Sequence, residues 1–336
     1  MKIIKVSAGS KKKAHLLLRQ TVNLEGLWGN CRFIVNEKVE RCDWWFVLHG
    51  SGLLREEKCI CDPDHIVYVS MEPNENISGV HQDFLSQFSC IVTCDRSVKH
   101  DKKIYENWLT WWVGINVQKI RNKHKFLSRV RFGYDELVLM SPERKINKVS
   151  VIVSDKTYTD GHLLRLQFIE SLANSEISKY IDIFGHGFNE IPDKWDAISP
   201  YKYHLVLENS ITKDYWSEKL ADAFLGFSFP IYSGCPNINK FFNIDSLEVI
   251  DINRHEDAIF AIKSIIQNDV YSKKIEQIKD SRDKILFEYN IFNLMSKLAT
   301  KTAEKYEKVK LRQNSFYIDS YLKRIIRKLF NFFHHG

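Results

Sequence analysis

The sequence lacks any long hydrophobic run, and this absence excludes several classes of protein. No stretch approaches the run of about 18 consecutive apolar residues that a membrane-spanning helix needs. The opening MKIIKVSAGSKKK has too short an apolar run for a signal peptide, so we expect a cytoplasmic protein. No internal repeat or low-complexity tract is visible. The 336 residues, 44% apolar and 27% charged, are typical of a soluble globular protein large enough for two domains.

The cysteines and the charge exclude further classes. Seven cysteines are an odd number at irregular spacing, and the pair Cys59 and Cys61 does not match the C-x₂-C of a zinc module. We therefore expect reduced thiols, most of them in the core. The formal net charge of +7 is modest. Since no homeodomain, zinc-finger or RNP pattern accompanies it, the charge does not indicate nucleic-acid binding.

Short apolar runs separated by polar stretches predict an α/β protein. In the first half, four such runs indicate buried strands of a parallel sheet: 2–6, 43–48, 66–71 and 90–94. Residues 117–148 are basic and irregular, and the composition changes again at a clear strand, 149–154. We expect an N-terminal domain over 1–146, a second α/β domain over 147–300 and a separate tail over 301–336.

Residues 201–234, YKYHLVLENSITKDYWSEKLADAFLGFSFPIYSG, contain the most informative pattern. A buried strand is predicted over 203–207, and Ser217 is a typical N-cap for the apolar-periodic helix that follows. A strand, a polar loop and a helix start form the place where open α/β sheets bind ligands. Lys219 lies in the first helical turn, where the helix dipole disfavours a cation. Its position fits either of two interpretations: an anionic ligand binds nearby, or Lys219 is an ordinary solvated surface residue.

This stretch resembles the donor-binding signature of the α-1,3/4-fucosyltransferases, glycosyltransferase family 10. Members have an aromatic-rich strand, FENS-like residues, a tyrosine, an [ST]EK helix start and a Pro-[IV]-x-x-G strand; here Leu207 replaces the usual Phe. The resemblance implies a GT-B fold, in which two Rossmann-like domains face each other across a cleft, and GDP-β-L-fucose as the donor. It also implies that Asn209 and Tyr215 line the donor pocket and that Glu218 binds the ribose.

A second similar segment follows the strand 149–154. There His162 to Arg165 read HLLR at the start of a predicted helix. An arginine beside a strand end can hold a diphosphate with two parallel hydrogen bonds, or it can be an ordinary surface residue. Family members similarly carry SN-K…H-x-LR-x-x-F, with Asp155 here in place of the Asn. The resemblance assigns Arg165 to the donor diphosphate, and it extends over about 149–293.

Two carboxylates after the strand 66–71 are candidates for a catalytic base. In the sequence MEPNEN, Glu72 and Glu75 flank Pro73, which stiffens the turn. The residues alone fit either a solvated loop or a turn that faces a crevice. Family members have an ESP-like or ENESP-like turn whose Glu deprotonates the acceptor hydroxyl. Glu72 matches it most directly, although the Ser before the Pro is missing, and Glu75 is the second candidate.

These residues together predict an inverting transfer that needs no metal. Arg165 and Lys219 can offset the charge of the departing diphosphate, and no DxD-like acidic pair accompanies the donor motif. Glu72 or Glu75 takes the proton while the acceptor oxygen attacks the anomeric carbon on the face opposite the diphosphate. From the bacterial relatives we expect the acceptor to be O3 of GlcNAc or glucose in a surface glycan such as lipopolysaccharide O-antigen.

The last residues of the sequence form a basic amphipathic pattern. Over 320–333 bulky apolar residues recur at helical spacing, and cations fill the opposite face: Lys323, Arg324, Arg327 and Lys328. Such a helix suits an anionic bilayer surface, or it docks on its own protein or a dimer partner. Bacterial family members similarly end in basic amphipathic tails. This favours peripheral contact with the inner face of the cell membrane.

Two other functions fit parts of the sequence. One is a GT-B enzyme that uses a different nucleotide sugar, which a panel of donors would distinguish. The other is a non-catalytic basic protein that binds membrane or nucleic acid through its tail and residues 117–148. In that case guanine nucleotides would not stabilise the protein.

Overall fold

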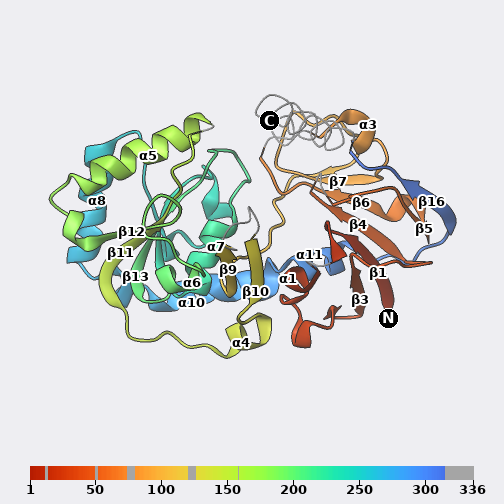
Figure 1. The fold of residues 1–336 in the computed structure, drawn as a ribbon, viewed down its shortest axis with the longest axis horizontal. Helices are drawn as coiled ribbons and strands as arrows, with labels where there is room; N and C mark the ends of the chain where they lie inside the picture. Colours follow the sequence, from red (N-terminus) through yellow and green to blue (C-terminus); the bar gives the residue numbers. More distant parts are fainter. Residues whose placement is uncertain (12–13, 50–51, 74–79, 120–125, 158, 315–336) are drawn as a thin grey trace, which may run out of the picture. The chain divides into compact units, whose positions relative to one another are not determined.

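The computed structural model describes residues 1–11, 14–49, 52–73, 80–119, 126–157 and 159–314. The chain divides into two compact units. Unit 1 consists of Met1–Leu18, Leu24–Trp108 and Leu294–Gly336, and unit 2 consists of Arg19–Asn23 and Leu109–Asn293. Each unit has its own parallel sheet (Figure 1). The predicted α/β class is therefore confirmed in both units.

Unit 1 contains a seven-stranded sheet in the order β2-β3-β1-β4-β6-β7-β8. All neighbours are parallel except β2 and β3. The strands are β1 (Lys2–Ser7), β2 (Leu27–Trp28), β3 (Cys31–Val35), β4 (Trp44–Leu48), β6 (Ile66–Val69), β7 (Cys90–Val92) and β8 (Lys103–Ile104). Every side chain of β4 and β6 is buried, because both faces of a central parallel strand are covered. The four strands predicted in the first half are thus confirmed as β1, β4, β6 and β7.

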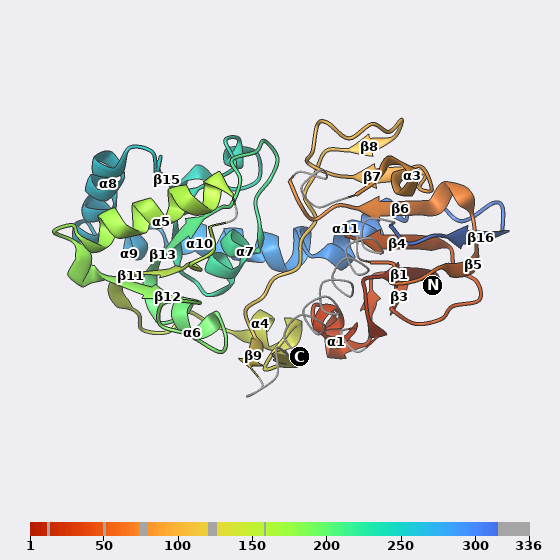
Figure 2. The ribbon, with the colours of Figure 1, turned by 45° about the horizontal axis from the view of Figure 1, so that its top comes forward.

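Unit 2 contains a five-stranded, wholly parallel sheet in the order β12-β11-β13-β14-β15. Its strands are β11 (Ile146–Ile152), β12 (Ile181–Phe184), β13 (Tyr201–Leu207), β14 (Phe229–Ser233) and β15 (Glu248–Val249). Helices α5 (Asp160–Ala173) and α8 (His255–Gln267) pack together. Helix α7 (Glu218–Leu225) contacts α6 (Trp195–Ile198) and α10 (Ile275–Asp283) (Figure 1, Figure 2). Together these helices enclose the sheet in one continuous apolar core.

Shorter elements complete the two units. The remaining helices are α1 (Ala14–Leu18), α3 (Gln82–Leu85), α4 (Tyr134–Leu139), α9 (Val270–Lys273) and α11 (Ile291–Leu298). Single helical turns are η2 (Val22–Leu24), η3 (Pro63–His65), η4 (Ser178–Tyr180), η5 (Ile238–Lys240), η6 (Ile244–Ser246) and the π-helical η7 (Lys284–Glu288). None of the helices in the described ranges is long and apolar enough to cross a bilayer.

The domain boundaries differ from those expected. The chain passes from unit 1 to unit 2 between Trp108 and Leu109, well before residue 146. The segment expected to be irregular contains an antiparallel pair, β9 (Ile115–Lys119) and β10 (Phe126–Val130). We expected this basic segment to form the end of the N-terminal domain, but its Phe132 and Leu137 pack into the core of unit 2. Surface charge therefore did not indicate which core the segment joins.

The chain also returns to unit 1 after Asn293. Strand β16 (Glu307–Leu311), within the region predicted as a separate tail, pairs antiparallel with β5 (Glu57–Cys61). Such a pairing between distant segments has no local sequence signal, because only the partner strand reveals it. Residues 320–333, the predicted amphipathic helix, lie outside the described residues.

All seven cysteines are free thiols, and all except the half-buried Cys90 are buried. The sulfur atoms of Cys42 and Cys59 are 3.4 Å apart, which is a hydrogen-bonding distance and not a disulfide. The expectation of reduced thiols mainly in the core is confirmed.

Candidate functional site

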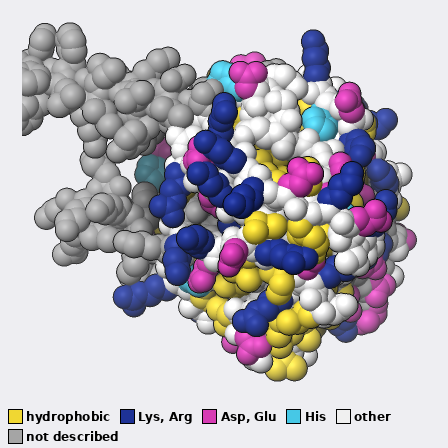
Figure 3. Space-filling model, turned by 90° about the vertical axis from the view of Figure 1, so that its right-hand side faces the viewer, with side chains coloured by type: hydrophobic (Ala, Val, Ile, Leu, Met, Phe, Trp, Pro, Cys, Tyr) yellow, Lys and Arg dark blue, Asp and Glu magenta, His cyan; other side chains and the backbone are white. Residues whose placement is uncertain are grey.

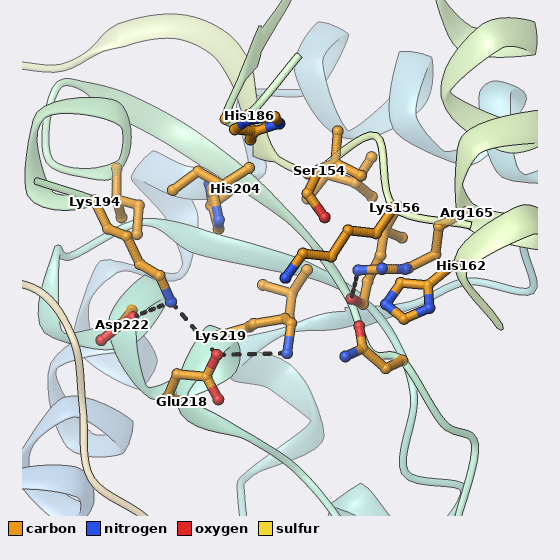
Figure 4. A pocket seen from close by; sticks show the side chains of 18 residues that line it. Ser154, Lys156, His162, Arg165, His186, Lys194, His204, Glu218, Lys219 and Asp222 are labelled. Atoms are coloured by element: carbon orange, nitrogen blue, oxygen red, sulfur yellow. Dashed lines mark hydrogen bonds and ion pairs between the residues drawn. The ribbon is translucent and has the colours of Figure 1, made fainter. Parts of the chain in front are cut away.

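A cavity of about 370 Å³ lies at the carboxyl ends of the parallel strands of unit 2 (Figure 4). Strand β13, the segments that follow β11, β12 and β13, the residue before α6 and the first two turns of α5 and α7 contribute its polar lining: Ser154, Lys156, His162, Arg165, His186, Lys194, His204, Asn209, Glu218, Lys219 and Asp222. This is the edge at which open α/β sheets bind ligands. Four lysines and arginines face two carboxylates there, so the lining favours an anion.

Helix α5 approaches the end of β13 closely because residue 161 is glycine. A Cβ atom on Gly161 would lie 2.2 Å from the carbonyl oxygen of Asn209, a distance that no side chain could occupy. Thr159 caps the helix, accepting a hydrogen bond from the backbone N–H of His162 at 3.3 Å. Together the cap and the glycine place the first turn of α5 against the loop that follows β13.

The start of α7 is fixed by a buried carboxylate at the end of β13. Glu208 accepts hydrogen bonds from the backbone N–H of Ser217 at 2.7 Å and from its hydroxyl at 2.6 Å. Ser217 in turn caps α7, accepting from the backbone N–H of Lys219 at 3.3 Å. The predicted N-cap is therefore confirmed. The arrangement places Glu218 and Lys219 at the cavity.

Arg165 is a buried cation in the lining of the cavity. Its side chain is only 4% exposed, and its Nε and Nη1 atoms donate to the carbonyl oxygens of Gly161 at 3.3 Å and Leu207 at 3.5 Å. Within the described part of the chain it forms no ion pair. Burial lowers the pKa of Arg165, and the charge of Glu208 offsets only part of that. Because a buried, unmatched charge is costly, this arrangement indicates an anionic ligand.

Lys219 and Lys156 bring two more cations to the same cavity. The Nζ atom of Lys219 lies 3.1 Å from the Ser217 hydroxyl and 3.5 Å from carboxylate oxygens of Glu208 and Glu218. Figure 4 shows the Lys156 side chain reaching into the cavity beside Arg165. These cations come from different segments, so the fold gathers them at one place.

Two histidines of the cavity, His162 and His204, have lowered pKa values. Burial, and then the charges of Arg165, Lys156 and Lys219, lower the pKa of His162. Burial, and then Lys194 and Lys145, lower the pKa of His204 to about 3. His204 is therefore neutral at physiological pH. Its Nδ1 atom lies 2.8 Å from the Ser150 hydroxyl.

A second charged group in the cavity was not found from the sequence. The Nζ atom of Lys194 lies 3.0 Å from Asp222 and 3.5 Å from Glu218. Burial opposes the charge of Lys194, but the two carboxylates outweigh it and raise its pKa. Burial likewise opposes the charge of Glu218, but Lys194 and Lys219 lower its pKa to about 2. Only the four-residue spacing of Glu218 and Asp222 on α7 gave a signal, since it puts them on one helical face.

Four of the predicted donor-binding residues line this one cavity: Arg165, Asn209, Glu218 and Lys219. Tyr215, the fifth, is buried and does not line it.

Glu72, the first candidate for the catalytic base, is exposed in unit 1, just after β6. Its backbone N–H lies 3.4 Å from the Ser70 hydroxyl, and its backbone C=O accepts from that hydroxyl at 3.1 Å. Glu75 lies outside the described residues. In the described ranges no three His, Cys, Asp or Glu side chains gather as a metal site.

Residues 142–275, which contain this cavity, match the sequence model of the glycosyltransferase family 10 (fucosyltransferase) C-terminal domain. This region of the chain is similar to the fucosyltransferases of glycosyltransferase family 10. The matched region includes all five residues that the sequence assigned to donor binding, from Arg165 to Lys219.

Similar proteins include three named as fucosyltransferases or fucosyltransferase-like. An α-(1,3)-fucosyltransferase from Helicobacter pylori is 37% identical over 78 residues, covering 23% of this chain and 16% of that protein. The 4-galactosyl-N-acetylglucosaminide 3-α-L-fucosyltransferase 9 of Mus musculus is 37% identical over 102 residues, 28% of each chain. A fucosyltransferase-like protein from Arabidopsis thaliana is 29% identical over 113 residues, 33% of this chain and 22% of that protein. The matched stretches thus span less than a third of each relative.

Among solved structures, an α1,3-fucosyltransferase with GDP-fucose is similar with a TM-score of 0.45 and 17% identity, over 82% of this chain and 81% of that one. The same enzyme type with GDP gives a TM-score of 0.46, 17% identity and coverages of 85% and 90%. Likeness at this level does not identify a ligand.

Proposed function

We propose that the chain is a fucosyltransferase that moves L-fucose from GDP-β-L-fucose to a hydroxyl group of a glycan, with inversion at the anomeric carbon. One observation supports this most strongly. Arg165 is buried with no carboxylate partner among the described residues, next to Lys219, in a cavity within the region that matches family 10. A diphosphate is the anionic group of an activated sugar, and it would match these two cations.

The cavity residues would perform the donor side of the reaction. As the bond between the anomeric carbon and the diphosphate breaks, negative charge grows on the departing oxygen. The Arg165 guanidinium and the Lys219 ammonium would stabilise that charge, which is why we propose a reaction without a metal. Asn209 and Glu218 would bind other parts of the nucleotide, with the Glu218 carboxylate accepting from the ribose hydroxyls.

The acceptor side rests on the sequence. Glu72, with Glu75 as the alternative, would take the proton of the acceptor hydroxyl as its oxygen attacks. Attack opposite the diphosphate inverts the configuration. The proposed acceptor is O3 of GlcNAc or glucose in a surface glycan such as lipopolysaccharide O-antigen, as the resemblance to bacterial family members suggests.

A donor panel tests this proposal. The full-length protein is incubated with GDP-fucose, GDP-mannose or a UDP-sugar on a glycan array, and transfer is read from labelled sugar. We expect transfer from GDP-fucose alone, to glycans with terminal or internal GlcNAc or glucose. Transfer from another donor would replace the proposed substrate, and no transfer together with no binding of GDP would refute the proposed function.

We also propose peripheral membrane contact through residues 320–333. The support is their amphipathic pattern, together with the face of unit 1 that carries β5 and β16. On this face Lys and Arg side chains lie between exposed hydrophobic ones (Figure 3). A hollow there is lined by apolar residues, by Glu40 and by four lysines: Lys38, Lys58, Lys308 and Lys310. Lys308 and Lys310 belong to β16, shortly before the tail.

Truncation after Asn314 should therefore weaken binding to anionic membranes. Each basic residue near an anionic surface contributes about 1 kcal/mol, so loss of the four cations of the tail should lower vesicle affinity by on the order of 100-fold or more. Co-sedimentation with phosphatidylglycerol vesicles measures this, with phosphatidylcholine vesicles as the control. If the truncated protein sediments with phosphatidylglycerol as well as the full chain does, the tail is not the membrane contact.

A further inference from the structure

Lys194 holds a position in the cavity that the proposed chemistry does not yet use. It precedes α6, and its half-buried ammonium lies between two carboxylates of α7, Asp222 at 3.0 Å and Glu218 at 3.5 Å. Figure 4 shows Lys194 on the side of the cavity opposite Arg165, with its end directed at both carboxylates. Arg165 has no carboxylate partner among the described residues, whereas the charge of Lys194 is already matched twice. Lys194 is therefore a poor candidate for a phosphate ligand and a good candidate for holding the carboxylates.

The contact between Lys194 and Asp222 is rigidly anchored. Asp222 is fully buried, and its Oδ1 atom accepts the backbone N–H groups of Trp112 at 2.8 Å and Val113 at 3.1 Å. Its other oxygen, Oδ2, accepts from Lys194. Because two backbone hydrogen bonds fix the carboxylate plane, Asp222 determines where the ammonium of Lys194 lies.

The contact between Lys194 and Glu218 then orients the residue proposed to bind ribose. Lys194 and Lys219 both contact the Oε1 atom of Glu218, so Oε2 is the oxygen that neither lysine holds. Glu218 and Asp222 are four residues apart on one helix, so their charges repel each other unless a cation lies between them. Lys194 and Lys219 keep the pKa of Glu218 low, at about 2, although burial acts against the charge. An ionised carboxylate accepts hydrogen bonds from hydroxyl groups and binds them more strongly than a neutral acid does.

We infer that Lys194 is a positioning residue that holds the Glu218 carboxylate toward the ribose hydroxyls of the donor, so that the site selects ribonucleotides over their deoxy analogues. This inference rests on the proposed function. It adds Lys194 to the proposed donor site, and it adds selectivity for ribonucleotides over deoxyribonucleotides.

The test compares the affinities of GDP and 2′,3′-dideoxy-GDP by isothermal calorimetry. In the natural protein, hydrogen bonds from two hydroxyls to a charged acceptor should make GDP bind on the order of 100-fold more tightly. In Lys194→Met the ratio of the GDP affinity to the 2′,3′-dideoxy-GDP affinity should fall to roughly fivefold or less, because GDP loses affinity while the dideoxy analogue does not. Lys194→Arg should restore most of the ratio, since a guanidinium also bridges two carboxylates. Glu218→Gln should reduce the ratio in the same way as Lys194→Met.

Two further variants separate positioning from folding. The double variant Lys194→Met/Asp222→Asn removes the cation without leaving a buried aspartate unpaired, and the oxygen of the introduced amide still accepts from the backbone. It should fold and should also show the reduced ratio. Lys202→Met is the matched control, because Lys202 is a half-buried lysine that pairs with Asp269 at 2.8 Å at the other end of β13. It should keep the full ratio.

The outcomes distinguish this inference from the proposed function. If the natural protein does not bind GDP, the proposed function fails and the inference fails with it. If it binds GDP but does not distinguish the dideoxy analogue, or if both Lys194 variants keep the ratio, only the inference is overturned. Equal weakening of both ligands in Lys194→Met and in the double variant would also overturn it, since that result indicates a purely structural role.

Discussion

Replacing Arg165 by methionine is expected to weaken donor binding strongly while leaving the fold at least as stable. The guanidinium is buried, and among the described residues it forms two long hydrogen bonds to backbone carbonyls, at 3.3 and 3.5 Å. An apolar side chain of similar length removes the cost of burying an unmatched charge, so the melting temperature should stay the same or rise. Loss of a charged partner of a buried phosphate should cost about 2–5 kcal/mol, a fall in GDP affinity of roughly 30-fold to several thousand-fold. Calorimetry and thermal denaturation measure the two effects.

Arg282→Met is the matched control for this experiment. Arg282 is as deeply buried as Arg165, but its guanidinium donates to the carbonyl oxygens of Leu225 and Leu137, away from the cavity. Burial lowers its pKa to about 10. Its removal takes away the hydrogen bonds that join α10 to Leu225 of α7 and Leu137 of α4, so the variant should lose stability and should bind GDP normally while folded. If Arg165→Met instead destabilises the protein and keeps its GDP affinity, Arg165 is a structural residue.

Glu72→Gln should lower kcat by about 10²- to 10⁴-fold without changing the affinity for GDP. Glutamine keeps the size and polarity of the side chain but cannot take a proton from the acceptor hydroxyl. The side chain is exposed in unit 1, so the melting temperature should not change. Initial rates at saturating GDP-fucose and acceptor measure kcat, and calorimetry measures GDP binding.

Glu75→Gln decides between the two candidate bases. If Glu72 is the base, Glu75→Gln should retain most of the activity, and the reverse result would assign the role to Glu75. Normal kcat in both variants would show that the base lies elsewhere in the chain.

The elements that build the cavity could be predicted because their signals are local. The run 203–207 is apolar enough to specify a buried strand, and β13 (Tyr201–Leu207) contains it. Ser217 is a favourable N-cap, and it caps α7 as expected. Arg165 and Lys219 could be predicted because each lies near the start of a helix that follows a strand end. Because parallel strands bring their carboxyl ends to one edge, these separate local signals meet at one site.

The parts that could not be predicted depend on contacts between distant segments. Lys194 meets Asp222, 28 positions later, only because α6 and α7 pack together. No capping or periodicity rule marks a lysine before a short helix as part of a site. The division at Trp108 and Leu109 was also missed, since the basic character of the following segment describes its surface and not its core. Tyr215 matched a family position, yet its side chain is buried and does not form part of the cavity lining.

The affinity difference between GDP and guanosine tests the central claim most directly, namely that Arg165 and Lys219 bind the diphosphate of the donor. With the natural protein, we expect guanosine to bind on the order of 1,000-fold more weakly than GDP, because it offers neither cation an anionic partner. In the double variant Arg165→Met/Lys219→Ala this difference should largely disappear. Equal affinity for guanosine and GDP in the natural protein, or an unchanged difference in the double variant, would contradict the account.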